Sequence, residues 1–217
     1  MEFKNYMEEL AGLIKEKLPE TIIVCGGVHP TINQSCVIET KALDAVFIGE
    51  SEFSFIEFLD AIGQGQSYRA VDNISYVYDG QVIVNKLKPL IQNLDELPFP
   101  DRDISMFDET LHAAGYAPFL FSKGCPYLCT YCSNHAIARA YGLNRNFPRY
   151  RSAESSIREI EEVIDKYPVS KIGIVDDIFG IDKDWRREFC DKYTRRIRIP
   201  FFCVLRANIV DEEFIRL

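Results

Sequence analysis

The sequence lacks any apolar run of the roughly 20 residues that a membrane-spanning helix needs. Its first residues, 1–5, also lack the apolar stretch of a secretory signal peptide. Positive charge is not in excess, since 25 Lys and Arg stand against 33 Asp and Glu and give a net charge of −8. These absences predict a cytoplasmic protein without a membrane span, and the acidic balance argues against nucleic acid as a partner.

Internal repeats and low-complexity tracts are also absent. With 47% hydrophobic and 27% charged residues, the composition is ordinary for a folded chain, and 217 residues allow one or two domains with a buried core. The seven cysteines form an odd number, so a closed disulfide framework would leave one over. In a reducing cytoplasm they are expected to be core fillers, metal ligands or catalytic thiols.

The first half of the chain has the pattern of a parallel α/β sheet. Amphipathic spacing predicts a helix over residues 5–18, and two short apolar runs, 21–25 and 45–48, have the character of buried strands. Each run ends in glycine, at Gly26-Gly27 and at Gly49, and glycine there lets backbone approach a ligand or a neighbouring helix. Two further helices are expected over 35–41 and 52–62, the second with Phe55, Phe58, Leu59 and Ile62 facing inward.

A hairpin and a proline-rich segment follow. Asp79-Gly80 is a type I′ turn pair between two alternating segments, 74–78 and 81–85. Prolines at 89, 98 and 100 with interspersed acids indicate a linker or a wrapped loop over residues 89–103. The expected division is therefore a first domain over 1–70, the hairpin and linker over 71–116, and a second domain over 117–217.

The second half repeats a strand–helix pattern. Strands are predicted over residues 117–122, 171–175 and 201–205, and Ser152 and Asp182 are expected to cap the helices between them. Residues 133–151 have the character of a loop whose four arginines are expected to form a solvated face, with neutralisation of a carboxylate or phosphate as the alternative. These arginines are Arg139, Arg145, Arg149 and Arg151.

Three cysteines, Cys125, Cys129 and Cys132, fall within eight residues and directly follow the strand at 117–122. Gly124 beside the first of them indicates a strand-to-loop turn. Three thiolates at this spacing indicate an iron–sulfur cluster in which one iron keeps an open position for a substrate. Spacing alone leaves two alternatives: a stripe of cysteines packed on one helical face, or a zinc-stabilised binding module in which His135 is the fourth ligand.

The Cys-x3-Cys-x2-Cys element, with Tyr131 before its last cysteine, resembles the signature of radical S-adenosylmethionine (SAM) enzymes. The resemblance extends over residues 117–217 and implies the first half of a (βα)6 partial barrel. It implies that Cys125, Cys129 and Cys132 bind a [4Fe-4S] cluster, which cleaves SAM reductively to methionine and a 5′-deoxyadenosyl radical.

Four other positions carry over from this family. Tyr131 matches the aromatic position near the adenine of SAM. Asp176 and Asp177 stand where the family often has a Gly-Gly-Glu segment that contacts the amino group of SAM. Arg206 follows the third strand, where polar side chains reach the ribose or carboxylate of SAM.

Residues 20–62 resemble the C-terminal part of a Rossmann-like cobalamin-binding domain. The segments that carry this resemblance are 24–31 and 49–52, and it implies that Gly26 and Gly27 approach the nucleotide tail of cobalamin. The family's Asp-x-His-x-x-Gly and Ser-x-Leu elements are absent from the residues before Gly26, and His29 is not at the matching position. We therefore expect a fragment that holds about half of each domain.

These resemblances imply a radical SAM enzyme of the cobalamin-associated subgroup. Its expected reaction is methyl transfer, cyclisation or rearrangement on a small-molecule or lipid substrate, with an electron donor such as flavodoxin or ferredoxin. Methylthiolation of transfer RNA is an alternative within the same superfamily. That alternative predicts a further cysteine trio in an N-terminal domain, which this sequence does not contain.

Overall fold

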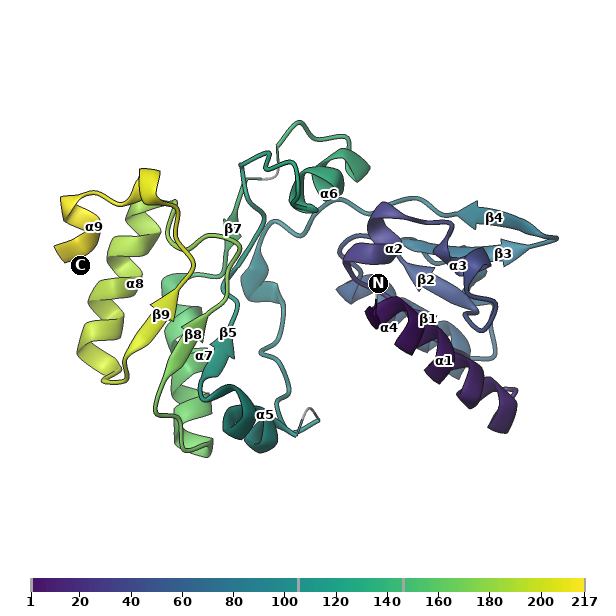
Figure 1. Ribbon diagram of the computed structural model, residues 1–217, viewed down its shortest axis with the longest axis horizontal. Coiled ribbons are helices and arrows are strands. Elements are labelled where there is room, and N and C mark those ends of the chain that lie inside the picture. Colours follow the sequence, from purple (N-terminus) through teal and green to yellow (C-terminus); the bar gives the residue numbers. More distant parts are fainter. Residues whose placement is uncertain (1, 105, 146, 217) are drawn as a thin grey trace. The chain divides into compact units, whose positions relative to one another are not determined.

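The computed structural model describes residues 2–104, 106–145 and 147–216 (Figure 1). The chain forms two compact units: Met1–Ile91 with Tyr127–Asn146, and Gln92–Pro126 with Phe147–Leu217. This division differs from the expected one, because the hairpin belongs to the first unit and the segment after residue 126 returns to that unit. Among the described residues, no helix is both long and apolar enough to cross a bilayer.

The first unit is built on a four-stranded sheet with the order β1-β2-β3-β4. Strands β1 and β2 pair in parallel, as the sequence predicts, whereas β3 and β4 form the expected hairpin and add to the sheet in antiparallel fashion. Asp79 and Gly80 both have positive φ, as a type I′ turn requires. The elements of this unit are α1 (Glu2–Lys17), β1 (Val24–Cys25), α2 (Val28–Ile32), α3 (Cys36–Glu39), β2 (Ala45–Phe47), α4 (Glu52–Gly63), the 3-10 helix η1 (Tyr68–Ala70), β3 (Ile74–Tyr78), β4 (Gln81–Val84) and α6 (Asn134–Ala140).

Alternation along β2 gives this sheet an apolar core on both faces. Val46 packs with Leu43 on one face, where α1 and α3 also contribute side chains. Phe47 packs on the other face with Ile74 of β3 and Phe58 of α4. The sheet is therefore covered on both sides, which is typical of strands in an α/β fold.

Two expectations for the first half are wrong in extent. Only Val24–Cys25 of the run 21–25 forms a strand, and it is half-buried because β1 lies at the edge of the sheet. In α4, Phe58 is buried but Phe55 and Leu59 are exposed. Strands of two to five residues offer too little sheet to cover every apolar position of a three-turn helix.

The second unit is built on a three-stranded parallel sheet with the order β5-β8-β9, as the strand–helix pattern predicts. Helices α7 and α8 lie side by side and pack against it through one continuous core (Figure 1). Strands β6 and β7 form a separate, short antiparallel pair. Along the chain, β6 follows β5 and β7 precedes α7. The elements are η2 (Leu94–Glu96), α5 (Phe107–Ala114), β5 (Ala117–Phe119), β6 (Ser122–Lys123), β7 (Arg149–Tyr150), α7 (Ala153–Lys166), β8 (Ile172–Ile174), α8 (Lys183–Arg196), β9 (Phe201–Cys203), η3 (Ala207–Ile209) and α9 (Glu212–Arg216).

Both expected caps are present. The Ser152 side chain accepts a hydrogen bond from the Ser155 N–H at 3.1 Å, and Asp182 accepts from the N–H groups of Asp184 and Trp185 at 3.0 and 2.9 Å. These bonds satisfy backbone donors that the first turn of a helix leaves free. They fix where α7 and α8 begin, and so where the loops after β7 and β8 end.

The expectation of a loop over residues 133–151 is wrong, because this segment contains α6 and β7. Its solvated arginine face is also wrong for Arg151, which is buried. Arg151 donates to the carbonyls of Leu97 and Pro98 at 2.8 and 3.1 Å, so it holds the proline-rich segment against the rest of the second unit. Arg139 and Arg145 are exposed, as predicted.

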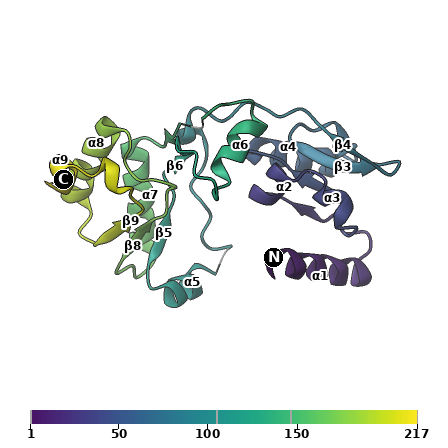
Figure 2. The same ribbon diagram turned by 45° about the horizontal axis from the view of Figure 1, so that its top comes forward.

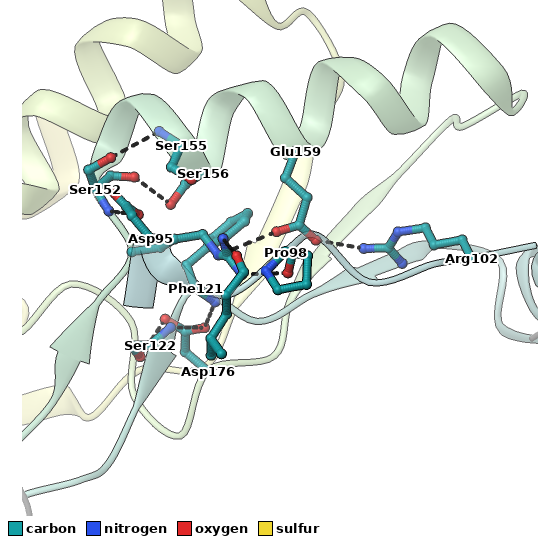
Figure 3. Close-up of polar contacts among 12 residues, drawn as sticks. Asp95, Pro98, Arg102, Phe121, Ser122, Ser152, Ser155, Ser156, Glu159 and Asp176 are labelled. Atoms are coloured by element: carbon teal, nitrogen blue, oxygen red, sulfur yellow. Dashed lines mark hydrogen bonds and ion pairs between the residues drawn. The ribbon is translucent and has the colours of Figure 1, made fainter. Parts of the chain in front are cut away.

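The proline-rich segment is a wrapped loop, the second of the two forms expected for it. Its Asp95 accepts from the Ser152 N–H at 2.8 Å, and its Arg102 donates to Glu159 of α7 at 3.1 Å (Figure 3). Glu159 is 2% exposed, and this burial raises the pKa of its carboxyl group. We call residues 92–103 the strap, since its side chains bind α7 at two places, at its start (Ser152) and at its middle (Glu159).

Candidate functional site

The cysteine loop follows strand β6 directly, as predicted. Gly124 has φ of +104°, a conformation that favours glycine, and the chain leaves the strand there. Residues 124–133 contain no helix, so the alternative of cysteines packed on a helical stripe is wrong. The loop ends where α6 begins at Asn134.

The three cysteines of this loop are half-buried and none of them is in a disulfide. Cys125 belongs to the second unit, whereas Cys129 and Cys132 belong to the first. The Cys132 N–H donates to the Cys129 carbonyl at 3.0 Å, and the Asn134 side-chain amide donates to Cys132 Sγ at 3.6 Å. Three thiols in one loop, outside any disulfide, are a donor set of the kind that iron–sulfur clusters use.

Over the described part of the chain, no three His, Cys, Asp or Glu side chains are gathered as a metal site would have them. Cys129, Cys132 and His135 lie in one unit and still do not form such a group. The Nδ1 atom of His135 is buried without a hydrogen-bond partner among the described residues. The arrangement of these side chains therefore supports neither the zinc alternative nor the cluster over the other, and both stay predictions.

Tyr131 is 91% exposed, so its ring packs against no protein core. It belongs to the first unit and lies one residue before Cys132. An aromatic ring left in solvent beside a thiol is available to stack on a flat ligand. The sequence-based expectation for Tyr131 concerns such a ligand and stays a prediction.

Asp176 lies at the carboxyl end of β8 and is 1% exposed. One carboxylate oxygen accepts from the N–H groups of Phe121 and Ser122 at 2.7 and 3.2 Å, and the other accepts from Ser122 Oγ at 2.7 Å (Figure 3). Burial raises its pKa to about 6, although these hydrogen bonds act in the opposite direction. Asp176 thus joins the ends of two strands and has protein partners for both oxygens.

Asp177 and Arg206 differ from Asp176 because both are exposed. Asp177 is the next residue after Asp176, and Arg206 follows β9. The Arg206 Nε atom donates to the Asn208 side chain at 3.3 Å. Both residues lie after the carboxyl ends of parallel strands, the position where open α/β sheets bind ligands.

The first unit also has a carboxyl edge, formed by the ends of β1 and β2. Gly27 has φ of +102° and precedes α2, and a Cβ added there would meet nothing within 4 Å. Gly26 is exposed, and a Cβ there would lie 3.6 Å from Phe47 Cβ. This backbone is therefore sterically open, and the expectation that Gly26 and Gly27 approach cobalamin stays a prediction. His29 is exposed in α2.

Sequence reasoning missed the residues that connect these elements. Ser122, which binds Asp176, lies 54 positions before it, and Thr31 connects the two strand ends of the first unit. Tyr141, at the end of α6, accepts a hydrogen bond from the Glu50 N–H at 2.6 Å. Periodicity and motif spacing report neighbours along the chain, so no pattern in the sequence could have found these contacts.

Two curated relatives cover most of the chain. An uncharacterized methyltransferase of Pyrococcus horikoshii is 32% identical over 178 residues, which are 80% of this chain and 37% of the relative. The anaerobic magnesium-protoporphyrin IX monomethyl ester cyclase of Rubrivivax gelatinosus is 27% identical over 201 residues, which are 87% of this chain and 34% of the relative. The chain thus spans about a third of the length of these relatives, and no protein-family model matches it.

Solved structures show the fold. The radical SAM methyltransferase TsrM from Kitasatospora setae, solved with cobalamin and a [4Fe-4S] cluster, matches 99% of this chain and 42% of its own, with a TM-score of 0.76 and 15% identity. The cobalamin-dependent radical SAM enzyme OxsB, solved with aqua-cobalamin and SAM, matches 96% of this chain and 30% of its own, with a TM-score of 0.75 and 22% identity. The predicted fold class is therefore confirmed: part of a Rossmann-like domain followed by part of a radical SAM barrel.

Proposed function

We propose that this chain belongs to the cobalamin-associated radical SAM enzymes, whose fold it shares, and that it carries the cluster-binding and SAM-binding part of such an enzyme. The observation that carries the proposal is the trio of cysteines in a loop after the first strand of the parallel sheet, within a match that covers both units. The activity of the whole protein extends beyond this chain, which spans about a third of its curated relatives.

The proposed cluster ligands are Cys125, Cys129 and Cys132. Three ligands leave one metal position open, where SAM can bind through its amino and carboxylate groups. When bound, a [4Fe-4S] cluster supplies the single electron that cleaves SAM to methionine and a 5′-deoxyadenosyl radical. The chain's part is to hold the three thiols, and the side-chain amide of Asn134 donates a hydrogen bond to Cys132 Sγ and so orients it.

The proposed SAM contacts are Tyr131, Asp177 and Arg206. Tyr131 offers an exposed ring for adenine, Asp177 an exposed carboxylate for the amino group, and Arg206 a guanidinium for the carboxylate or ribose. Asp176 is assigned a supporting part instead. Its oxygens already bind Phe121 and Ser122, so it holds in place the strand ends from which Cys125 and Asp177 follow.

The proposed cobalamin contacts are Gly26 and Gly27, whose open backbone at the carboxyl edge of the first sheet admits a nucleotide tail. The exposed His29 is not assigned to cobalt, because it stands in α2 rather than in the family's histidine motif. The proposed reaction is methyl transfer, cyclisation or rearrangement on a small-molecule or lipid substrate. The single electron requires a donor protein such as flavodoxin or ferredoxin.

Anaerobic reconstitution with iron and sulfide tests the cluster proposal. The chain is expected to bind about four iron and four sulfide. Low-temperature EPR of the reduced protein should then show a cluster signal that changes when SAM is added. Cysteine-to-alanine variants at 125, 129 and 132 should each lose most of the iron, because each removes one of three ligands.

The matched control is Cys190→Ala. Cys190 is a half-buried free thiol outside the loop, on α8, so its loss should leave the iron and sulfide content unchanged. One zinc per chain without sulfide would overturn the cluster assignment and favour the zinc-stabilised module. A cluster signal that SAM leaves unchanged would overturn the open-position assignment.

A further inference from the structure

The turn after β2 is fixed by hydrogen bonds within the first unit. Asn73 is fully buried, and its amide donates to the carbonyls of Ile48 and Glu50 at 2.9 and 3.0 Å. Thr31 Oγ1 accepts from the Gly49 N–H at 2.8 Å and donates to the Gly27 carbonyl at 2.7 Å. The strand-end turn, residues 48–50, is therefore a rigid anchor that also holds the glycine loop after β1.

Tyr141 binds this anchor. Its hydroxyl oxygen accepts from the Glu50 N–H at 2.6 Å, and the ring lies directly against Gly49. A Cβ added at Gly49 would overlap the Tyr141 hydroxyl and lie 2.7 Å from its Cζ. Gly49 also has φ of +70°, so glycine is required there both by the backbone and by the packed phenol.

Tyr141 is also connected to two of the cysteines through a short, continuous element. Helix α6 begins two residues after Cys132, packs against α2 and ends at Ala140 (Figure 2). The Tyr141 N–H donates to the Ala138 carbonyl at 3.1 Å, which continues the helix to this residue. A residue that fixes the end of a two-turn helix also restricts the loop at its start, which carries Cys129 and Cys132.

We propose that Tyr141 is a positioning residue. Its hydroxyl docks α6 on the strand-end turn and thereby holds the Cys129 and Cys132 thiols at the carboxyl edge of the first sheet, the edge that also carries Gly27. The inference rests on the proposed function, because positioning these two thiols matters only if they hold a cluster. The first unit would then position two of the three proposed cluster ligands, Cys129 and Cys132.

Cysteine alkylation in the cluster-free chain tests the docking directly. Tyr141→Phe removes the hydroxyl, and with it the hydrogen bond from the Glu50 N–H, which should speed the reaction of Cys129 and Cys132 with iodoacetamide by roughly threefold to tenfold. Cys125 in the second unit and the buried Cys36 in the first should react at the wild-type rate. Tyr78→Phe, which keeps an exposed ring elsewhere in this unit, is the matched control.

A second pair of variants tests the packing rather than the hydrogen bond. Gly49→Ala should force the Tyr141 ring away. Gly65 has nearly the same φ, +67°, but a Cβ added there would meet nothing within 4 Å, so Gly65→Ala is the control. Only Gly49→Ala should expose Cys129 and Cys132. The contrast between the two alanines separates displacement of Tyr141 from the cost of a positive φ.

In reconstituted protein, Tyr141→Phe should lose iron to a chelator roughly threefold to tenfold faster than wild type and give a more heterogeneous EPR signal. If alkylation and iron loss both match wild type, the positioning assignment is wrong. If the wild-type chain binds no iron, the proposed function fails, and the alkylation contrast still decides whether Tyr141 docks α6.

Discussion

The carboxylate of Asp176 accepts a hydrogen bond from the Phe121 N–H at 2.7 Å and so joins the end of β8 to the chain that follows β5. Ser122 adds two more donors, its N–H and its hydroxyl. The bonds hold together two neighbouring strand ends of the parallel sheet, just before the cysteine loop begins. A residue expected to bind SAM therefore has a structural task that can be tested by substitution.

Asp176→Asn and Asp176→Ala should separate this task from a ligand role. Asparagine keeps an oxygen for the Phe121 N–H and can donate to Ser122 Oγ, whereas alanine leaves buried donors without an acceptor. The alanine variant should be less stable than the asparagine variant by about 2–3 kcal/mol in urea unfolding. Equal stability of the two variants would contradict the structural assignment.

Stability should also depend on pH through Asp176. Burial raises its pKa from 3.8 to about 6, so the folded chain holds the proton more tightly than the unfolded chain does. The stabilisation is full below about pH 4 and is lost as the pH rises towards about 6. The difference in unfolding free energy between wild type and Asp176→Asn should therefore fall by on the order of 2 kcal/mol across this range, measured by urea titrations at several pH values. A stability difference that does not change with pH would contradict the raised pKa of Asp176.

Glu159→Ala should strongly destabilise the second unit. It would leave the Arg102 guanidinium, bonded to Glu159 at 3.1 Å, and the buried Arg151 without their common carboxylate. Removing one partner of a buried ion pair costs about 3–5 kcal/mol, and hydrogen exchange should rise along the strap. The control is Glu162→Ala, whose exposed pair with Arg158 is expected to contribute less than about 1 kcal/mol. Similar losses in both variants would contradict the strap's dependence on Glu159.

Arg186→Met should leave the second unit at least as stable as wild type. Arg186 is 1% exposed, donates to the Gly180 carbonyl at 2.7 Å and stacks on Phe214 at 4.2 Å. Its Nε and Nη2 have no hydrogen-bond partner among the described residues, and a buried unsatisfied polar group costs about 1–3 kcal/mol. Methionine fills a similar volume without those donors. A loss of more than about 2 kcal/mol in chemical unfolding would show that the guanidinium is better satisfied than its contacts indicate.

The sequence by itself determined the local elements and the chemistry available to them. Ser152 and Asp182 start their helices where predicted, Asp79-Gly80 turns the hairpin, and Gly124 ends the strand before the cysteines. Each depends on a preference of one residue or on a short spacing, which a single sequence displays. The three-cysteine motif likewise identifies its chemistry through the order of its residues.

Only the tertiary structure decided which distant segments join. Tyr141 contacts Glu50 across 91 positions, and Arg151 binds the strap across more than 50. The tertiary structure also decided that Asp176 is buried and hydrogen-bonded to Phe121 and Ser122, whereas the adjacent Asp177 is exposed. The two are the same residue type, so their sequence context alone does not distinguish them. The physical reason is that periodicity fixes how a side chain lies on its own element, whereas its partners and its pKa are set by elements that pack from elsewhere in the chain.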